Sequence, residues 1–269
     1  MDATTRHNVH ESGVAGGQPM LFAHGFGCDQ NMWRHVAPRF EDRYRVVLFD
    51  HVGAGGAHRD AYDPERHDRL EGYAADVVDL VEELDLRDVV FVGHSVSAMI
   101  GVLAAAEVPD RFAHLVLVGP SPRYLDDPDT GYVGGFRRED IDGLLESLAS
   151  NYLGWSAAMA PAIVGNPDRP ELGAELTESF CRADPDIQRR WARATFLADN
   201  RADLARVRTP ALVLQCSDDI IAPDAVGRYV HEHLEGSVLV HLAATGHCPN
   251  LSAPDETTQA IEAYLREHG

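Results

Sequence analysis

The stretch Val89–Ala106, VVFVGHSVSAMIGVLAAA, places a serine between two apolar segments and decides the fold. Val89–Val92 is a short β-branched run typical of a buried strand, and Ser97–Ala106 is an almost wholly apolar run typical of a buried helix. A strand that ends in G-x-S-x-G and turns sharply into a helix is a nucleophile elbow, which exposes the serine hydroxyl at the edge of a sheet. The stretch therefore predicts that Ser95 is a nucleophile. The alternative is a serine in an ordinary strand-to-helix loop.

The residues two before and two after Ser95 have to be small, because the strand and the helix pass close together at such a turn. Gly93 meets this requirement. Ser97 stands where the motif has glycine, and serine is small enough for the turn to form with slight strain. We therefore expect the elbow in spite of this departure.

Further short apolar runs predict strands, and the segments between them predict helices. The other strand candidates are Met20–Ala23, Tyr44–Phe49, His114–Val118, Ala211–Gln215 and Ser237–Leu242. Tyr73–Leu84 carries apolar residues at spacings of three and four, which is the pattern of one helix face. Strands that alternate with helices pair in parallel and carry helices on both faces of the sheet. The predicted fold class is therefore α/β, with a mostly parallel central sheet.

Strand signals vanish between about residues 122 and 204, where helical patterns follow one another. These patterns cover Arg138–Leu153, Trp155–Val164, Glu171–Cys181 and Asp186–Leu197. We interpret residues 122–204 as a helical insertion between two parts of one core, residues 1–121 and 205–269, and the second part closes with a helix at Asp255–Glu267. A length of 269 residues fits such a core better than two independent domains.

Charge and cysteine content argue against several classes of protein. With 23 basic and 43 acidic residues, the formal net charge is −20, and an acidic surface repels phosphate backbones and anionic lipid. We therefore expect no binding to nucleic acid or to membranes, and no segment approaches the roughly 20 apolar residues of a membrane span.

The first twenty residues lack the pattern of a signal peptide. The four cysteines are scattered, which favours a cytoplasmic protein without a disulfide framework or a zinc site.

The sequence predicts no cofactor and no metal. Gly53–Gly56 follows a strand candidate, but it is not G-x-G-x-x-G, and the residues after it are too polar for a buried helix that faces phosphate. HExxH and other spaced sets of metal ligands do not occur.

A serine nucleophile needs a base, and the base needs an orienting carboxylate. In folds with this elbow the chain order is serine, acid, histidine. Asp218 and Asp219 both follow the strand candidate Ala211–Gln215; the four-residue spacing to Pro223 favours Asp219 as the acid and leaves Asp218 as a solvated turn residue. His247 comes after the last strand candidate and before the closing helix, so we predict that it is the base.

An oxyanion hole needs two backbone N–H groups, one from the residue after the nucleophile and one from the loop after an early strand. Val96 follows the nucleophile and is predicted to supply the first. His24–Gly27 follows Met20–Ala23 and is predicted to supply the second through Phe26. The alternative for this loop is a plain glycine turn.

Together these motifs resemble the α/β-hydrolase family, and within it the group of the bacterial stress-signalling hydrolase RsbQ and the plant karrikin and strigolactone receptors. The resemblance rests on short runs spread from about Pro19 to Leu265: Gly25–Gln30, Phe49–Gly53, Phe91–Val96, Val118–Pro122, Leu214–Cys216, Asp218–Pro223 and Gly246–Pro249. It implies a four-helix cap over a deep apolar pocket with the three catalytic candidates at its floor. It also implies slow turnover of a small apolar ester or lactone, and a signalling partner, which for RsbQ is a PAS-domain phosphatase.

Apolar residues of the insertion and of the rim are the natural wall of such a pocket. The candidates for the substrate pocket are Phe26, His94, Phe136, Trp155, Phe180, Phe196 and Ile220. Each of the apolar candidates could equally belong to the packing of the cap.

Three functions would use the same residues. The first is a serine hydrolase, in which Ser95 attacks an ester or lactone carbonyl, His247 moves the proton and Asp219 fixes the imidazole tautomer. The second is a ligand-responsive signalling protein that reports occupancy of the pocket with little turnover. The third is a cofactor-free haloperoxidase or carbon–carbon bond hydrolase, which only its substrate would distinguish.

Overall fold

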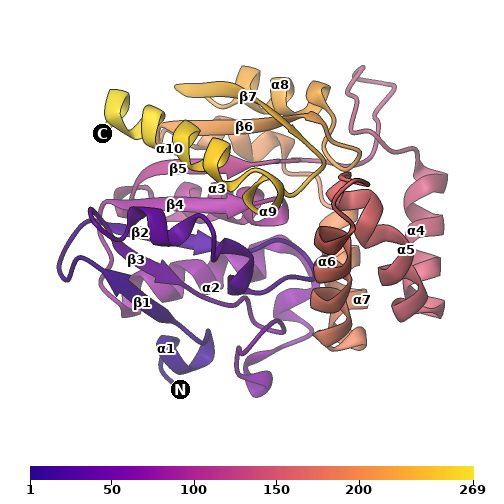
Figure 1. The fold of residues 1–269 in the computed structure, drawn as a ribbon, viewed down its shortest axis with the longest axis horizontal. Helices are drawn as coiled ribbons and strands as arrows, with labels where there is room; N and C mark the ends of the chain where they lie inside the picture. The colour runs from indigo at the N-terminus through magenta and orange to yellow at the C-terminus, as the bar shows by residue number, and fades with distance from the viewer.

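The computed structural model describes residues 1–269, and its centre is a seven-stranded sheet (Figure 1). The strand order is β1-β3-β2-β4-β5-β6-β7, and only β1 runs antiparallel to its neighbour. The strands are β1 (His10–Gly13), β2 (Pro19–Ala23), β3 (Arg45–Leu48), β4 (Val89–His94), β5 (Phe112–Val118), β6 (Ala211–Asp218) and β7 (Ser237–Thr245). The α/β class with a mostly parallel sheet is thus confirmed.

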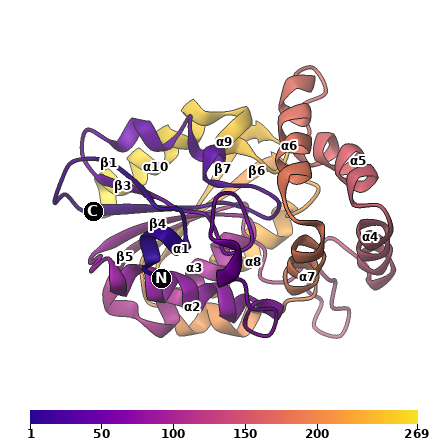
Figure 2. The same cartoon turned by 90° about the horizontal axis from the view of Figure 1, so that it is seen from below.

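Helices cover both faces of the sheet (Figure 2). One face carries α2 (Leu70–Glu83), α3 (Val96–Glu107) and α8 (Asp224–His233), and the other carries α9 (Pro249–Ser252) and α10 (Pro254–His268), while the short α1 (Ala3–Arg6) lies at the β1 edge. The side chains of β2 alternate between the two apolar cores: Met20 and Phe22 pack on the side of α10, and Leu21 and Ala23 pack on the side of α2 and α3. The period of two in a strand therefore fills both cores.

All the predicted strands occur, with shifted ends. The two last strands run further than predicted, because β6 and β7 pair along their length as far as Asp218 and Thr245. The sequence analysis missed β1, since its four residues are exposed and give no apolar signal. It also gave no range for α8, although that helix packs on β6 and β7.

Four helices stand between β5 and β6 and form a layer beyond the carboxyl ends of the strands (Figure 1). They are α4 (Arg138–Ser150), α5 (Tyr152–Val164), α6 (Pro170–Arg182) and α7 (Pro185–Phe196). Each corresponds to one of the four helical patterns of the predicted insertion. We refer to these four helices as the cap.

The turn between β4 and α3 forces the chain into a strained conformation. Ser95 has φ 57° and ψ −122°, and a non-glycine residue in such a region costs about 1–3 kcal/mol. A Cβ atom on Gly93 would lie 2.5 Å from the carbonyl oxygen of Ser97, so residue 93 has room only for glycine. Ser97 is itself fully buried and fits. The turn therefore forms with serine in the second small position.

Replacing Gly93 by alanine is expected to lower the free energy of unfolding by about 1–3 kcal/mol or more, because the new methyl group overlaps the backbone of α3. The matched control is Gly143→Ala in α4, where a Cβ meets nothing within 4 Å and alanine stabilises a helix by about 0.5–1 kcal/mol relative to glycine. Urea denaturation of both variants measures the difference. A Gly93→Ala protein as stable as the wild type would contradict the close approach of β4 and α3.

Candidate active site

Ser95, His247 and Asp219 form one chain of hydrogen bonds beneath the cap. The Ser95 hydroxyl lies 2.7 Å from Nε2 of His247, and Nδ1 of the same ring lies 2.7 Å from Oδ2 of Asp219. A carboxylate only accepts hydrogen bonds, so Nδ1–H donates to Asp219 and Nε2 is left to accept the hydroxyl proton of Ser95. All three side chains are buried. The structure therefore brings together the three residues predicted as nucleophile, base and acid.

The two neighbouring aspartates differ in their surroundings. Asp218 ends β6 and is exposed, whereas Asp219 is buried and its Oδ1 accepts the N–H groups of Ile221 at 2.8 Å and Ala222 at 3.0 Å. Burial alone would raise the pKa of Asp219. The charge of His247 and the hydrogen bonds from His247 and from the two amides outweigh it and hold that pKa below its usual value. Asp219 is therefore kept ionised beside the imidazole.

The loop that carries His247 is held from both sides. The His247 N–H donates to the carbonyl of Ile163 in the cap at 2.8 Å. The carbonyl of His247 lies 2.7 Å from Nε2 of His94, which must be the donor because a carbonyl only accepts. Burial lowers the pKa of His94 to about 3, so this ring is neutral. His94, predicted as a pocket residue, thus lines the cavity and also holds the backbone of His247, the predicted base.

Two backbone N–H groups are available beside Ser95. Val96 is the first residue of α3, where an N–H has no acceptor within the helix. The N–H of Phe26 makes no hydrogen bond inside the chain. The loop of Phe26 lies directly against the nucleophile, since a Cβ on Gly25 would come within 3.4 Å of the Ser95 Cβ. Both N–H groups predicted for an oxyanion hole therefore lie near Ser95 without a partner in the chain, and their role stays a prediction.

A small cavity opens above Ser95, and ten of its fourteen lining residues are apolar. Its volume is about 40 Å³, against roughly 300 Å³ or more for a typical ligand pocket, so only small groups fit without movement of the cap. The lining residues are Phe26, Cys28, His94, Ser95, Tyr124, Trp155, Ile163, Leu176, Phe180, Thr195, Phe196, Ile221, His247 and Cys248.

Five of the seven predicted pocket residues line this cavity, and two do not. Ile220 is 49% exposed, because the turn that points Asp219 inward sends the next side chain outward and brings Ile221 into the cavity instead. Phe136 is half-buried and pairs through its backbone with Leu125 in the segment before α4, outside the cavity. The prediction was therefore wrong for Ile220 and Phe136.

Tyr124 is a cavity residue that the sequence analysis missed. Its phenol is buried, and burial raises its pKa to about 12, although the nearby Ser95 side chain acts in the opposite direction. Tyr124 follows β5 in an irregular segment, where neither strand nor helix periodicity indicates which way a side chain points. The sequence held no signal for it.

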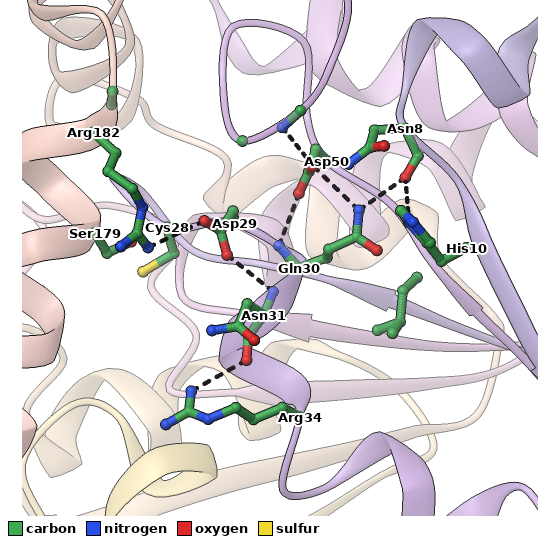
Figure 3. Close-up of a pocket in the computed structure, with 14 residues that line it drawn as sticks. Asn8, His10, Cys28, Asp29, Gln30, Asn31, Arg34, Asp50, Ser179 and Arg182 are labelled. Atoms are coloured by element: carbon green, nitrogen blue, oxygen red, sulfur yellow. Dashed lines mark hydrogen bonds and ion pairs between the residues drawn. The ribbon is translucent and has the colours of Figure 1, made fainter.

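A larger hollow of about 560 Å³ lies on the outside, between the loop of residues 28–34 and the end of α6 (Figure 3). Its lining is mostly polar, and its charged side chains already have partners: Arg34 pairs with Glu175, Arg182 pairs with Asp29 at 3.3 Å, and Asp50 accepts hydrogen bonds from Asn8, Gln30 and Gly56. It contains none of the three hydrogen-bonded candidates. Ser95 and His247 line the small apolar cavity instead.

The structure contains no group of three or more histidine, cysteine, aspartate or glutamate side chains placed to hold a metal ion. None of its helices combines the length and the apolar character needed to cross a bilayer.

The fold and the hydrogen-bonded chain are those of an α/β hydrolase, and residues 20–260 match the model of the alpha/beta hydrolase family. The protein belongs to this family. It is 42% identical to the karrikin insensitive 2 receptor CA of Petunia hybrida over 96% of this chain and 95% of that protein. It is 38% identical to the strigolactone esterase D14 of Arabidopsis thaliana, over 97% and 99% of the two chains. The structure of a hydrolase from Oleispira antarctica superimposes with a TM-score of 0.95 at 38% identity, over 98% and 96% of the two chains.

Protonation of Asp219 is expected to cost stability. Because its pKa is lowered in the folded state, the ionised carboxylate stabilises the fold above the unfolded value of about 3.9, and this contribution is lost as the pH falls through the folded value. The difference in unfolding free energy between the wild type and Asp219→Asn should therefore be largest near pH 7 and shrink below about pH 4. Urea denaturation across this range measures it. A difference that grows on acidification would contradict the direction of the shift.

Proposed function

We propose that the protein is a serine hydrolase of small apolar esters or lactones. The observation that carries the proposal is the buried hydrogen-bonded chain from Ser95 through His247 to Asp219 at the floor of an apolar cavity. The names of relatives support it, since one of them is a strigolactone esterase that matches almost the whole chain. The lining of the cavity favours a substrate with a small apolar acyl group, because its wall offers few polar partners.

In the proposed reaction, Ser95 Oγ attacks the carbonyl carbon while His247 Nε2 takes the hydroxyl proton. The carbonyl oxygen becomes an oxyanion, which the N–H groups of Phe26 and Val96 stabilise. His247 then gives its proton to the leaving alkoxide, and an acyl group remains on Ser95. In the second half of the cycle His247 takes a proton from a water molecule, whose oxygen attacks the acyl carbon; the bond to Ser95 Oγ then breaks, the acid leaves and His247 returns the proton to Oγ. Asp219 keeps the imidazole in the required tautomer throughout.

We also propose that occupancy of this cavity is signalled to a partner protein. Support comes from similarity over nearly the whole chain to proteins named as karrikin receptors, and from the resemblance to the RsbQ group, which points to a PAS-domain phosphatase in a bacterial stress response. The four free cysteines support a reducing, cytoplasmic location. In this second function, slow turnover would be sufficient.

Hydrolysis of p-nitrophenyl acetate tests the first proposal. Ser95→Ala and Asp219→Asn are each expected to lower kcat by roughly 10³-fold or more, because one removes the nucleophile and the other leaves the imidazole in the wrong tautomer. Asp218→Asn is the matched control, since this side chain is exposed and the imidazole of His247 is hydrogen-bonded to Asp219 instead. It should keep the wild-type kcat.

Turnover that survives Ser95→Ala would exclude the mechanism. If the wild type releases no nitrophenol while small apolar ligands raise its Tm, the receptor function stands and the hydrolase function does not.

The width of the cavity is expected to limit the length of the acyl chain. Trp155 lines it and stacks on Phe180 with 5.5 Å between ring centroids. Trp155→Leu should raise the ratio of kcat/KM for hexanoate over acetate esters about tenfold, because the space gained takes up about one or two more methylenes, each worth ~1 kcal/mol in such a pocket. Leu153→Ala, an exposed position of the same helix, is the control and should leave the ratio unchanged. An unchanged ratio in Trp155→Leu would show that this wall does not select the substrate.

A further inference from the structure

Ser97 joins two segments that surround the nucleophile. It lies in the first turn of α3, two residues after Ser95, and its side chain is fully buried. The Ser97 hydroxyl donates to the carbonyl oxygen of His24 at 2.5 Å. Its oxygen also lies 2.8 Å from Nε2 of His51, which follows β3. One hydroxyl thus connects the elbow with the loop after β2 and the loop after β3.

The directions of these hydrogen bonds follow from the groups involved. A carbonyl only accepts, so the Ser97 proton is used on His24, and His51 must donate to Ser97 through Nε2–H. The backbone N–H of His51 in turn donates to the ring Nε2 of His24 at 3.0 Å. The three residues therefore close a triangle of hydrogen bonds. Burial lowers the pKa of both imidazoles, which keeps them neutral.

The same triangle orients the peptide group that carries the Phe26 N–H. Nδ1 of His24 donates to the carbonyl oxygen of Gly25 at 2.9 Å, and the Cys28 N–H reaches the same oxygen at 3.2 Å. A peptide unit is planar, and its C=O and N–H point in opposite directions. Fixing the Gly25 carbonyl therefore fixes the direction of the Phe26 N–H, away from His24 and Cys28.

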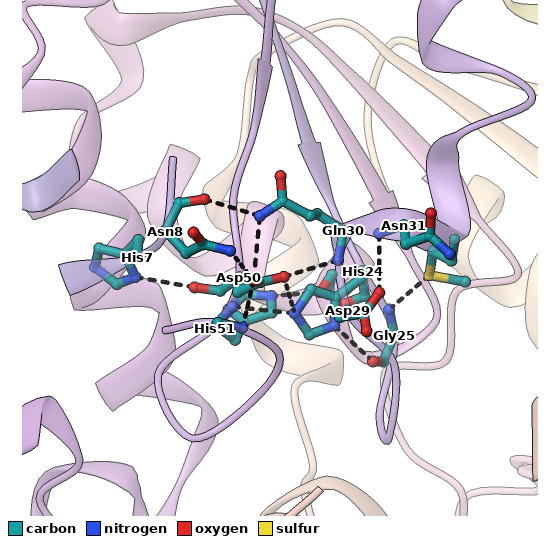
Figure 4. A network of polar contacts seen from close by, with 12 residues as sticks. His7, Asn8, His24, Gly25, Asp29, Gln30, Asn31, Asp50 and His51 are labelled. Carbon is teal, nitrogen blue, oxygen red and sulfur yellow. Dashed lines mark hydrogen bonds and ion pairs between the residues drawn. The ribbon is translucent and has the colours of Figure 1, made fainter. Parts of the chain in front are cut away.

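A buried carboxylate holds the next part of this loop (Figure 4). Asp50 accepts the N–H of Gln30 at 2.8 Å through Oδ1, and through Oδ2 it accepts Nδ2 of Asn8 and the N–H of Gly56, each at 2.8 Å. This end of the loop is therefore anchored to β3 and to the N-terminal segment. At the end next to the nucleophile, the His24 carbonyl is anchored by Ser97.

We propose that Ser97 is a positioning residue of the oxyanion hole. One donor, Val96, is its neighbour in α3, and the other, Phe26, belongs to the loop that its hydroxyl holds through His24. The hydroxyl thereby sets the distance and direction between the two N–H groups. A glycine in this position would form the turn but leave the His24 carbonyl without this donor. The inference rests on the proposed hydrolase function, because an oxyanion hole acts only when a tetrahedral oxyanion forms.

The experiment compares Ser97→Ala and Ser97→Gly with the wild type. Removing an oxyanion donor outright costs about 10²–10³ in kcat, so a displaced donor is expected to cost roughly tenfold or more, with KM within about twofold. Trifluoroacetophenone provides a second measurement. Ser95 Oγ adds to its carbonyl carbon, His247 takes the proton, and the carbonyl oxygen keeps the negative charge. Its Ki should rise by about the same factor as kcat falls, while the Kd of acetophenone, which forms no such oxyanion, should not change.

Ser237→Ala is the matched control. The Ser237 hydroxyl also donates to a histidine carbonyl, that of His231 at 3.1 Å, and also contacts a histidine ring nitrogen at 2.9 Å, but it lies at the start of β7, at the opposite edge of the sheet. This variant should keep the wild-type kcat and Ki. Tm values show whether each variant is folded, and the glycine variant replaces the alanine variant if the latter is not.

The outcomes separate this inference from the proposed function. Wild-type kcat and Ki in the folded Ser97 variants would overturn the positioning role alone. An equal loss of affinity for acetophenone and for trifluoroacetophenone would also overturn it, because it would show general damage to the cavity. If the wild type hydrolyses no ester yet forms the Ser95 adduct, the proposed function fails, and the comparison of Ki values still decides the role of Ser97. If no adduct forms on Ser95, both are overturned.

Discussion

The strained turn at Ser95 is the constraint on which the site depends. Its left-handed backbone conformation persists because β4 and α3 are each buried and approach each other so closely that Gly93 nearly contacts the backbone of Ser97. The strain of about 1–3 kcal/mol is offset by the apolar packing of the strand and the helix. The turn also places Ser95 in the lining of the cavity and makes Val96 the first residue of α3. The proposed nucleophile and the first proposed oxyanion donor are therefore adjacent parts of one local geometry.

The base is positioned by contacts on both sides of the cavity. The backbone of His247 is bound by Ile163 of the cap through its N–H and by His94 of the core through its carbonyl. A shift of α5 would therefore move the imidazole relative to Ser95. The same helix places Trp155 and Ile163 in the wall of the cavity, so one element contacts both the space above Ser95 and the backbone of His247. This connection suits both a slow hydrolase and a protein that reports occupancy.

Much of this arrangement could be predicted from the sequence, because the order of strands and helices along the chain determines where the candidate residues lie. Periodicity located β4 and α3. Chain order pointed to the turn after β6 and the loop after β7, since the ends of parallel strands meet at one edge of a sheet, and the spacing to Pro223 favoured Asp219 over Asp218. Side chains in irregular segments could not be placed in this way. Ile220 and Ile221 are neighbours of identical chemistry, and only the turn that points Asp219 inward decides which one faces the cavity. Tyr124 and Phe136 lie in the segment between β5 and α4, where no repeating pattern fixes direction. The strand β1 was missed because it lies at the edge of the sheet and all four of its residues are exposed, so it shows no apolar pattern.

The departure at Ser97 shows how one residue can satisfy two requirements. Sterically, position 97 tolerates only a small side chain, and serine satisfies this limit while it stays fully buried. A buried hydroxyl without partners would be costly, by about 1–3 kcal/mol, yet this one is fully used by His24 and His51. The histidines are equally dependent on it, since burial keeps them neutral and each needs a defined tautomer. The hydroxyl thus turns three separate loop ends into one rigid unit around the nucleophile, where glycine would supply only the space for the turn.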